Sequence, residues 1–197
     1  MSQDPRRGTA SMRFLVGLKA KGIPQESLLD SARAAARGLG VQCTNPKWTS
    51  FGTLELDVFS PTRGDFDLFL EAVSPLADLE FARDLNAPPE HRPEPELLSE
   101  ARSLFNAERY WECHEVLEGI WRSKQGEEKR LLQGIILVCA AFVHHQKGEA
   151  EVAIGIMRRA RPQLVYPSPK YGGFDVRALR ANVETVIQTG RFSNFRV

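Results

Sequence analysis

The sequence has few cysteines and no long apolar run. Its three cysteines, at positions 43, 113 and 139, are too few and too widely spaced for a disulfide framework or a CxxC zinc or redox site. The longest apolar run, residues 135–143, is about half of the roughly 20 residues that span a bilayer. We therefore expect a soluble, cytoplasmic protein with no membrane partner.

Neither sign of charge is in excess. The chain of 197 residues has 26 Lys and Arg against 25 Asp and Glu, so its formal net charge is +1. Nucleic acids are held by clusters of Lys and Arg that neutralise phosphates, and this balance supplies no such field over the whole chain. We therefore expect no nucleic-acid partner. The length allows one or two domains.

A proline-rich segment divides the chain. Four prolines fall within residues 86–95, which predicts a linker. Before the linker, residues 1–12 are expected to be a disordered leader, and residues 13–85 follow the order β-α-β-β-α-β of a ferredoxin-like domain. After it, residues 96–190 show helical spacing typical of an all-α bundle of about five helices. Residues 191–197 form a C-terminal tail, and the predicted fold class is α+β.

Alternation and helical spacing predict the individual elements. Strands are expected at 12–18, 41–49, 53–60 and 77–85. Helices are expected at 24–38, 62–73, 97–105, 109–123, 127–147, 149–164 and 175–188. Residues 167–173, which are rich in Pro and Gly, are expected to be a connection.

One predicted helix, YWECHEVLEGIW at residues 110–121, combines aromatic rings with ionisable groups. At about 100° per residue, one stripe of this helix is predicted to face the core and contains Tyr110, His114, Leu117 and Trp121. Glu118 lies on one flank of the stripe with Trp111. Glu112 and Glu115 are predicted to point to the opposite, solvated side. Cys113 is expected to be a buried thiol.

The buried carboxylate of Glu118 requires a partner, because an unpaired buried charge is costly. His114, four residues earlier, is within reach of it. In an antiparallel hairpin with the next helix, Gln133 lies level with Glu118, and Arg130 is the nearest candidate counter-charge. His144 is expected about 12 Å along the axis from His114, too far for both to bind one metal ion.

Three functions are compatible with this pattern. The first is a small-ligand or partner-binding pocket lined by Tyr110, Trp111, His114, Glu118, Trp121 and Gln133, with support from Glu115, Arg130 and His144. The second is a metal-dependent hydrolase, in which His114 and Glu118 bind the metal and Glu115 or His144 assists. The third is a structural homo-oligomer, in which a buried polar network fixes helix register. Only the second implies a cofactor, a divalent metal, and no catalytic residue is assigned.

The string HEVLE differs from the zinc-protease motif HExxH because Glu118 replaces the second histidine, so we do not expect a protease of that class. The segments FNAERYWECHEVLEGIW and RLLQGIILVCAAFVHHQKG resemble the helical family known as domain of unknown function 309 over residues 97–190. The positions that carry the resemblance are Phe105, Tyr110, Trp111, His114, Glu115, Glu118, Trp121, Gln133, Gly134, His144 and Gly148. Where the family usually shows Gly-Asn, this chain has Gly148 followed by Glu149. The resemblance implies a helical fold and a set of residues, but no reaction.

The C-terminal sequence RFSNFRV carries two phenylalanines that are expected to dock on a neighbouring subunit. The edges of small sheets also tend to pair across a two-fold axis. We therefore expect a homodimer.

Overall fold

The computed structural model describes residues 11–87, 92–193 and 195–197. The chain is an α+β protein that divides into two compact units, Met1–Pro89 and Glu90–Val197. Most of the leader expected at residues 1–12 and part of the linker expected at residues 86–95 lie outside the described residues. Within the described ranges, no helix has both the length and the apolar character needed to cross a membrane.

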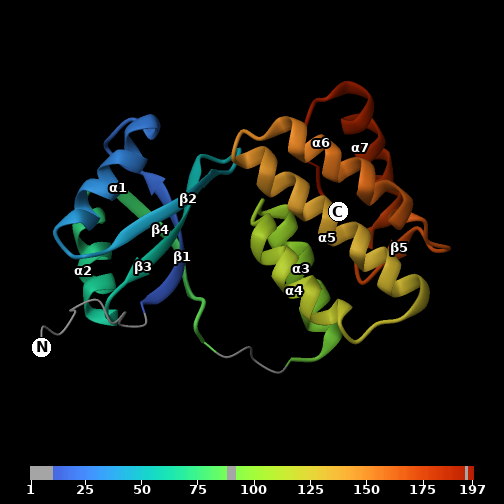
Figure 1. Ribbon diagram of the computed structural model, residues 1–197, viewed down its shortest axis with the longest axis horizontal. Coiled ribbons are helices and arrows are strands. Elements are labelled where there is room, and N and C mark those ends of the chain that lie inside the picture. Colours follow the sequence, from blue (N-terminus) through green and yellow to red (C-terminus); the bar gives the residue numbers. More distant parts are fainter. Residues whose placement is uncertain (1–10, 88–91, 194) are drawn as a thin grey trace, which may run out of the picture. The chain divides into compact units, whose positions relative to one another are not determined.

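The first unit is a four-stranded antiparallel sheet with two helices on one face (Figure 1). Its elements are β1 (Met12–Ala20), the short 3-10 helix η1 (Gln25–Ser27), α1 (Leu28–Arg37), β2 (Gln42–Trp48), β3 (Thr53–Ser60), α2 (Arg63–Val73) and β4 (Ala77–Asp84). The strands lie in the order β2-β3-β1-β4, and each neighbouring pair is antiparallel. The order of strands and helices expected from the sequence is confirmed, whereas the ferredoxin-like class stays a prediction.

Local sequence explains how this unit forms. In β3, alternate apolar side chains, such as Leu56, are fully buried in the core between the sheet and the two helices. The Thr62 hydroxyl caps α2 by accepting a hydrogen bond from the Asp65 backbone N–H at 3.1 Å. In β1, a Cβ atom at Gly17 would lie 2.3 Å from the ring of Phe81 on β4, so the aromatic ring occupies the space that any larger residue would need.

The second unit contains five α-helices in its described residues. Its elements are α3 (Glu94–Asn106), α4 (Tyr110–Trp121), α5 (Gly126–Gln146), α6 (Ala150–Ala160), the 3-10 helix η2 (Arg161–Leu164), β5 (Lys170–Tyr171), β6 (Phe174–Asp175) and α7 (Val176–Thr189). The sequence predicted α6 to continue through residue 164. The α-helix instead ends at Ala160, because Pro162 lacks the N–H that a continuing helix requires. The expected connection at 167–173 contributes to a two-stranded hairpin.

The C-terminal tail packs on its own helical unit. The ring of Phe142 in α5 lies 5.4 Å from Phe192 and 5.8 Å from Phe195, measured between ring centroids. The Asn106 side chain accepts a hydrogen bond from the backbone N–H of Val197 at 3.0 Å. Both phenylalanines are partly buried against the core of their own unit. Their docking on a neighbouring subunit and the homodimer stay predictions.

Candidate functional site

The inward face of α4 differs from the predicted stripe. The hydrophobic side chains that α4 buries are Tyr110, Cys113, Val116, Leu117 and Ile120. At about 100° per residue, His114 lies about 95° and Glu118 about 135° from the centre of this face. Both side chains are accordingly half-buried rather than enclosed. The predicted burial of this pair is therefore wrong, because the aliphatic residues and Cys113 define the core face.

Glu112 also departs from its expected position. It was predicted to face solvent, yet it is only 1% exposed, and the Arg109 guanidinium donates to both of its carboxylate oxygens, at 2.6 and 2.8 Å. A bidentate contact with arginine compensates the negative charge of a buried carboxylate. Glu115 is exposed, as the helical projection predicted.

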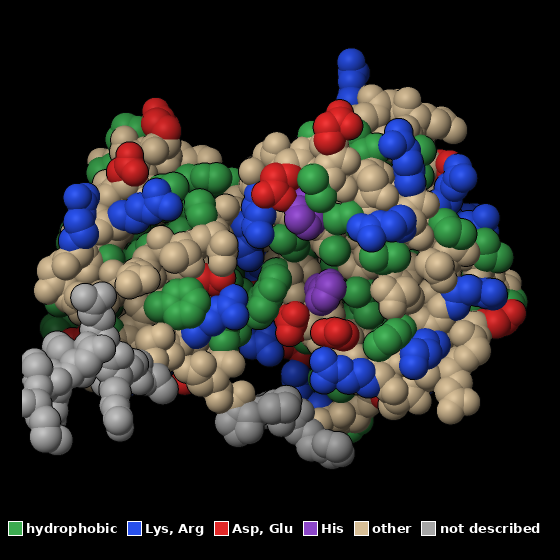
Figure 2. All heavy atoms as spheres, in the orientation of Figure 1, with side chains coloured by type: hydrophobic (Ala, Val, Ile, Leu, Met, Phe, Trp, Pro, Cys, Tyr) green, Lys and Arg blue, Asp and Glu red, His purple; other side chains and the backbone are tan. Residues whose placement is uncertain are grey.

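The side chains of His114, Glu115 and Glu118 lie close together on the outer side of α4. One ligand atom from each, an imidazole nitrogen and two carboxylate oxygens, lie within 4.8 Å of one another. We call these three residues the α4 ligand group. The i, i+1 and i+4 spacing allows this because glutamate side chains are long enough to converge on the ring from neighbouring helical positions. Figure 2 shows histidine side chains at the surface of the helical unit with acidic side chains beside them.

A hollow of about 160 Å³ adjoins this group between α4 and α5. Its lining residues are Trp111, His114, Ala140, Val143 and His144. His114 and His144 thus line the same hollow. Helical side chains lean toward the N-terminus of their own helix, so on two antiparallel helices these two side chains lean toward each other. The expectation that they are too far apart to bind one metal ion stays a prediction, and His144 does not belong to the α4 ligand group.

His144 has a carboxylate partner that sequence reasoning missed. Its Nδ1 atom makes a short contact with the Glu149 carboxylate, from the residue just before α6. Metal-binding histidines commonly use one ring nitrogen in this way, which fixes the orientation of the other. The available signal was the departure from the family pattern at position 149, where Glu replaces the usual Asn.

The counter-charges also differ from expectation. The carboxylate of Glu118 lies 3.6 Å from the Arg122 guanidinium, one turn further along α4. Arg130, the predicted partner, instead lies 3.8 Å from Glu127. Both pairs are of the i, i+3 or i, i+4 type and largely exposed, so each contributes little to stability.

The remaining predicted pocket residues lie apart from the hollow. Tyr110 stacks on Phe142 in the core, with ring centroids 4.5 Å apart, and its burial raises the pKa of its hydroxyl. The Lys129 ammonium lies 4.4 Å from the centre of the Trp121 ring. Gln133 is half-buried and does not line the hollow.

Cys113 is fully buried, as predicted, and its sulfur lies 3.4 Å from that of Cys139. Desolvation by burial raises the pKa of the Cys113 thiol, and the neighbouring thiol raises it further. A buried thiol of this kind is a poor nucleophile, because the thiolate is the reactive form. Cys113 therefore belongs to the core of the unit.

Fold and site together define a helical domain with a histidine and carboxylate cluster on α4. Residues 98–156, which include all of α4 and α5, match a family described as domain of unknown function 309 (DUF309). The matched residues lie within the helical unit.

Two related proteins each match about half of the chain. An uncharacterized protein from Aquifex aeolicus (strain VF5) is 26% identical over 102 residues, covering 51% of this chain and 31% of that protein. The chain therefore spans about a third of the length of this curated relative. A crystal structure of a conserved hypothetical protein from Thermus thermophilus is 34% identical and covers 50% of this chain and 100% of that chain, with a TM-score of 0.42.

Proposed function

We propose that the helical unit is a small-ligand-binding module whose ligand is a divalent transition-metal ion, held by His114, Glu115 and Glu118. The observation that supports this proposal most strongly is the convergence of one nitrogen and two oxygen ligand atoms within 4.8 Å. Two carboxylates and a neutral imidazole give a site charge of −2, which favours a divalent cation. The nearby Arg122 compensates part of this charge in the metal-free protein.

The donor set favours zinc or manganese. Imidazole suits zinc, and carboxylates suit manganese as well as zinc. In a tetrahedral zinc site with bonds of about 2.0–2.1 Å, neighbouring ligand atoms are roughly 3.4 Å apart. The three side chains would need to approach one another by about 1.4 Å or less, which side-chain rotation at a partly exposed position supplies.

Three protein ligands would leave one coordination position open. Sites with three protein ligands and an open position are the type that binds an exogenous molecule, whereas structural zinc sites are closed by four. Because His114 also lines the hollow, a metal ion on its ring adjoins a space that His144 borders, and the His144 ring contacts Glu149. The hydrolase alternative would use this open position for a water molecule.

For the first unit, the proposed class is ferredoxin-like, supported by the order of its elements and of its strands. That fold hosts many unrelated functions and adds no reaction to the proposal. The homodimer and the cytoplasmic location stay predictions.

Calorimetric titration of the chelator-treated full chain with zinc chloride, and separately with manganese chloride, tests the metal proposal. We expect one bound ion per chain. His114→Ala and Glu118→Gln should each weaken binding by about tenfold or more, since loss of even an outer-shell partner commonly costs 10–100-fold. The matched controls, His145→Ala and Glu96→Gln, remove the same kinds of side chain outside the group and should leave the affinity unchanged. Equal metal affinity of the wild type, the two site variants and the two control variants, or no metal binding by the wild type, would overturn the proposal.

A further inference from the structure

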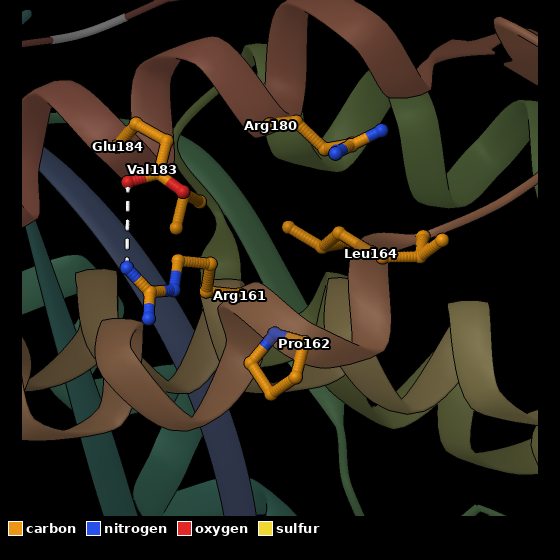
Figure 3. A pocket seen from close by; sticks show the side chains of 7 residues that line it. Arg161, Pro162, Leu164, Arg180, Val183 and Glu184 are labelled. Atoms are coloured by element: carbon orange, nitrogen blue, oxygen red, sulfur yellow. Dashed lines mark ion pairs between the residues drawn. The ribbon is translucent and has the colours of Figure 1, made fainter.

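A second hollow, of about 200 Å³, lies on the helical unit between η2 and α7. Its lining residues, shown in Figure 3, are Arg161, Pro162, Leu164, Val165, Arg180, Val183 and Glu184. None of them belongs to the α4 ligand group or to the hollow beside it. This second hollow, here called the η2–α7 hollow, therefore has its own chemistry.

The base of the η2–α7 hollow is apolar and is packed against the core of the helical unit. Leu164 and Val183 are fully buried members of the core. Leu164 is packed so closely on α5 that a Cβ atom at Gly134 would lie 2.8 Å from its side chain. Pro162 and the half-exposed Val165 extend the apolar surface toward solvent. An apolar group that enters the hollow thus meets a preformed surface.

The rim of the hollow carries a net positive charge. The Arg161 guanidinium lies 3.7 Å from the Glu184 carboxylate, so these two charges compensate each other. Arg180 extends away from this pair, on the Leu164 side of the hollow (Figure 3). Within the described part of the chain, Arg180 makes no ion pair. Two arginines and one glutamate leave a formal charge of +1, located at Arg180.

From this arrangement we infer that the η2–α7 hollow binds a small organic carboxylate, with its carboxylate on Arg180 and its apolar body on the accessible side chains of Pro162 and Val165. The planar guanidinium offers two parallel N–H donors that match the two oxygens of a carboxylate. A phosphate monoester carries about −1.5 to −2 charges at neutral pH, which exceeds the single uncompensated charge and would also face Glu184. The hollow is smaller than the roughly 300–1,000 Å³ that hold drug-sized ligands, so the apolar body is a ring or a short chain.

Nuclear magnetic resonance titration of the isotope-labelled full chain with benzoate tests this inference. We expect saturable shifts of the backbone amides of residues 161, 163–165 and 180–184. Acetate lacks the apolar body, benzyl alcohol lacks the charge, and inorganic phosphate carries excess charge. Each of these three should bind at least about tenfold more weakly than benzoate. Equal affinity for phosphate, or no saturable shift with benzoate, would overturn the inference.

Variants on the exposed face of α7 make the test specific. Arg180→Gln should weaken benzoate binding by about tenfold, whereas Arg177→Gln, one turn earlier and outside the lining, should not change it. Glu184→Gln removes the negative charge from the rim and should tighten binding of both benzoate and phosphate. Benzoate binding that is equal in wild type, Arg180→Gln and Glu184→Gln would refute the assigned roles. These benzoate titrations do not involve the α4 ligand group. A negative result in them is therefore distinct from a negative result in the metal titrations.

Discussion

Replacing Gly134 with alanine tests how the helical unit is packed. Gly134 lies in α5, directly beneath η2, and a Cβ atom there would lie 2.8 Å from the Leu164 side chain and 3.1 Å from the backbone carbonyl carbon of Gln163. The contact with Leu164 is not easily relieved, because that side chain is fully buried. The contact with Gln163 involves backbone, so η2 itself must move.

The expected magnitude follows from two opposing effects. Alanine favours a helix over glycine by about 0.8–1.0 kcal/mol. Overpacking a filled core typically costs about 1–3 kcal/mol. Gly155 in α6 supplies a matched control, because a Cβ atom there would meet no atom within 4 Å. Gly155→Ala should thus raise the free energy of unfolding by about 0.8–1.0 kcal/mol, and Gly134→Ala should lie about 1–3 kcal/mol below that control.

Urea unfolding monitored by far-ultraviolet circular dichroism measures this difference, because most of the helix belongs to the second unit. For a domain of this size, a separation of 1 kcal/mol corresponds to roughly 4–8 °C in the unfolding midpoint, so thermal melts give an independent check. If Gly134→Ala is stabilised as much as Gly155→Ala, the close approach of η2 to α5 is refuted.

Three further predictions concern charges and thiols. Arg122→Ala should raise zinc affinity by up to about fivefold, because an exposed ion pair with Glu118 is worth at most about 1 kcal/mol; calorimetry that shows weaker binding would contradict it. Burial raises the pKa of the Cys43 thiol to about 11, and all three cysteines are buried, so dithionitrobenzoate should label the native chain slowly and the urea-unfolded chain at once. Fast labelling of the native chain would show that the core opens readily. His145 stacks on Phe192, and partial burial lowers the pKa of its ring below 6.5. The unfolded state therefore binds a proton at higher pH than the folded state, and stability should fall as pH drops through the range just below 6.5. Urea midpoints above and below that pH should converge in His145→Gln, and an unchanged pH dependence would exclude this histidine as its source.

The fold was largely predictable because its patterns are local. Strict alternation over 53–60 defined β3 to the residue, and helical spacing located each helix within a few positions. The start of α3 was misplaced, because the sequence placed Pro95 in a linker whereas α3 begins at Glu94. Proline suits the first turn of a helix as well as a linker, and sequence alone does not separate the two.

The candidate site was less predictable because it depends on the rotation of one helix. The prediction assumed that the aromatic rings of α4 face inward, and this assumption placed His114 in the core. The core face of α4 is instead formed by residues that include Cys113, Val116 and Ile120. The shared lining of one hollow by His114 and His144 depends on the direction in which side chains lean, which an axial register ignores. The role of Glu149 depends on a contact between α5 and the residue that precedes α6, which no periodicity indicates.

Anomalous diffraction at the zinc absorption edge, from crystals of the full chain grown with zinc chloride, tests metal binding most directly. We expect one strong peak about 2.0–2.2 Å from a ring nitrogen of His114 and from carboxylate oxygens of Glu115 and Glu118. Zinc found only at other positions, or no peak beside His114, would contradict the proposed metal site.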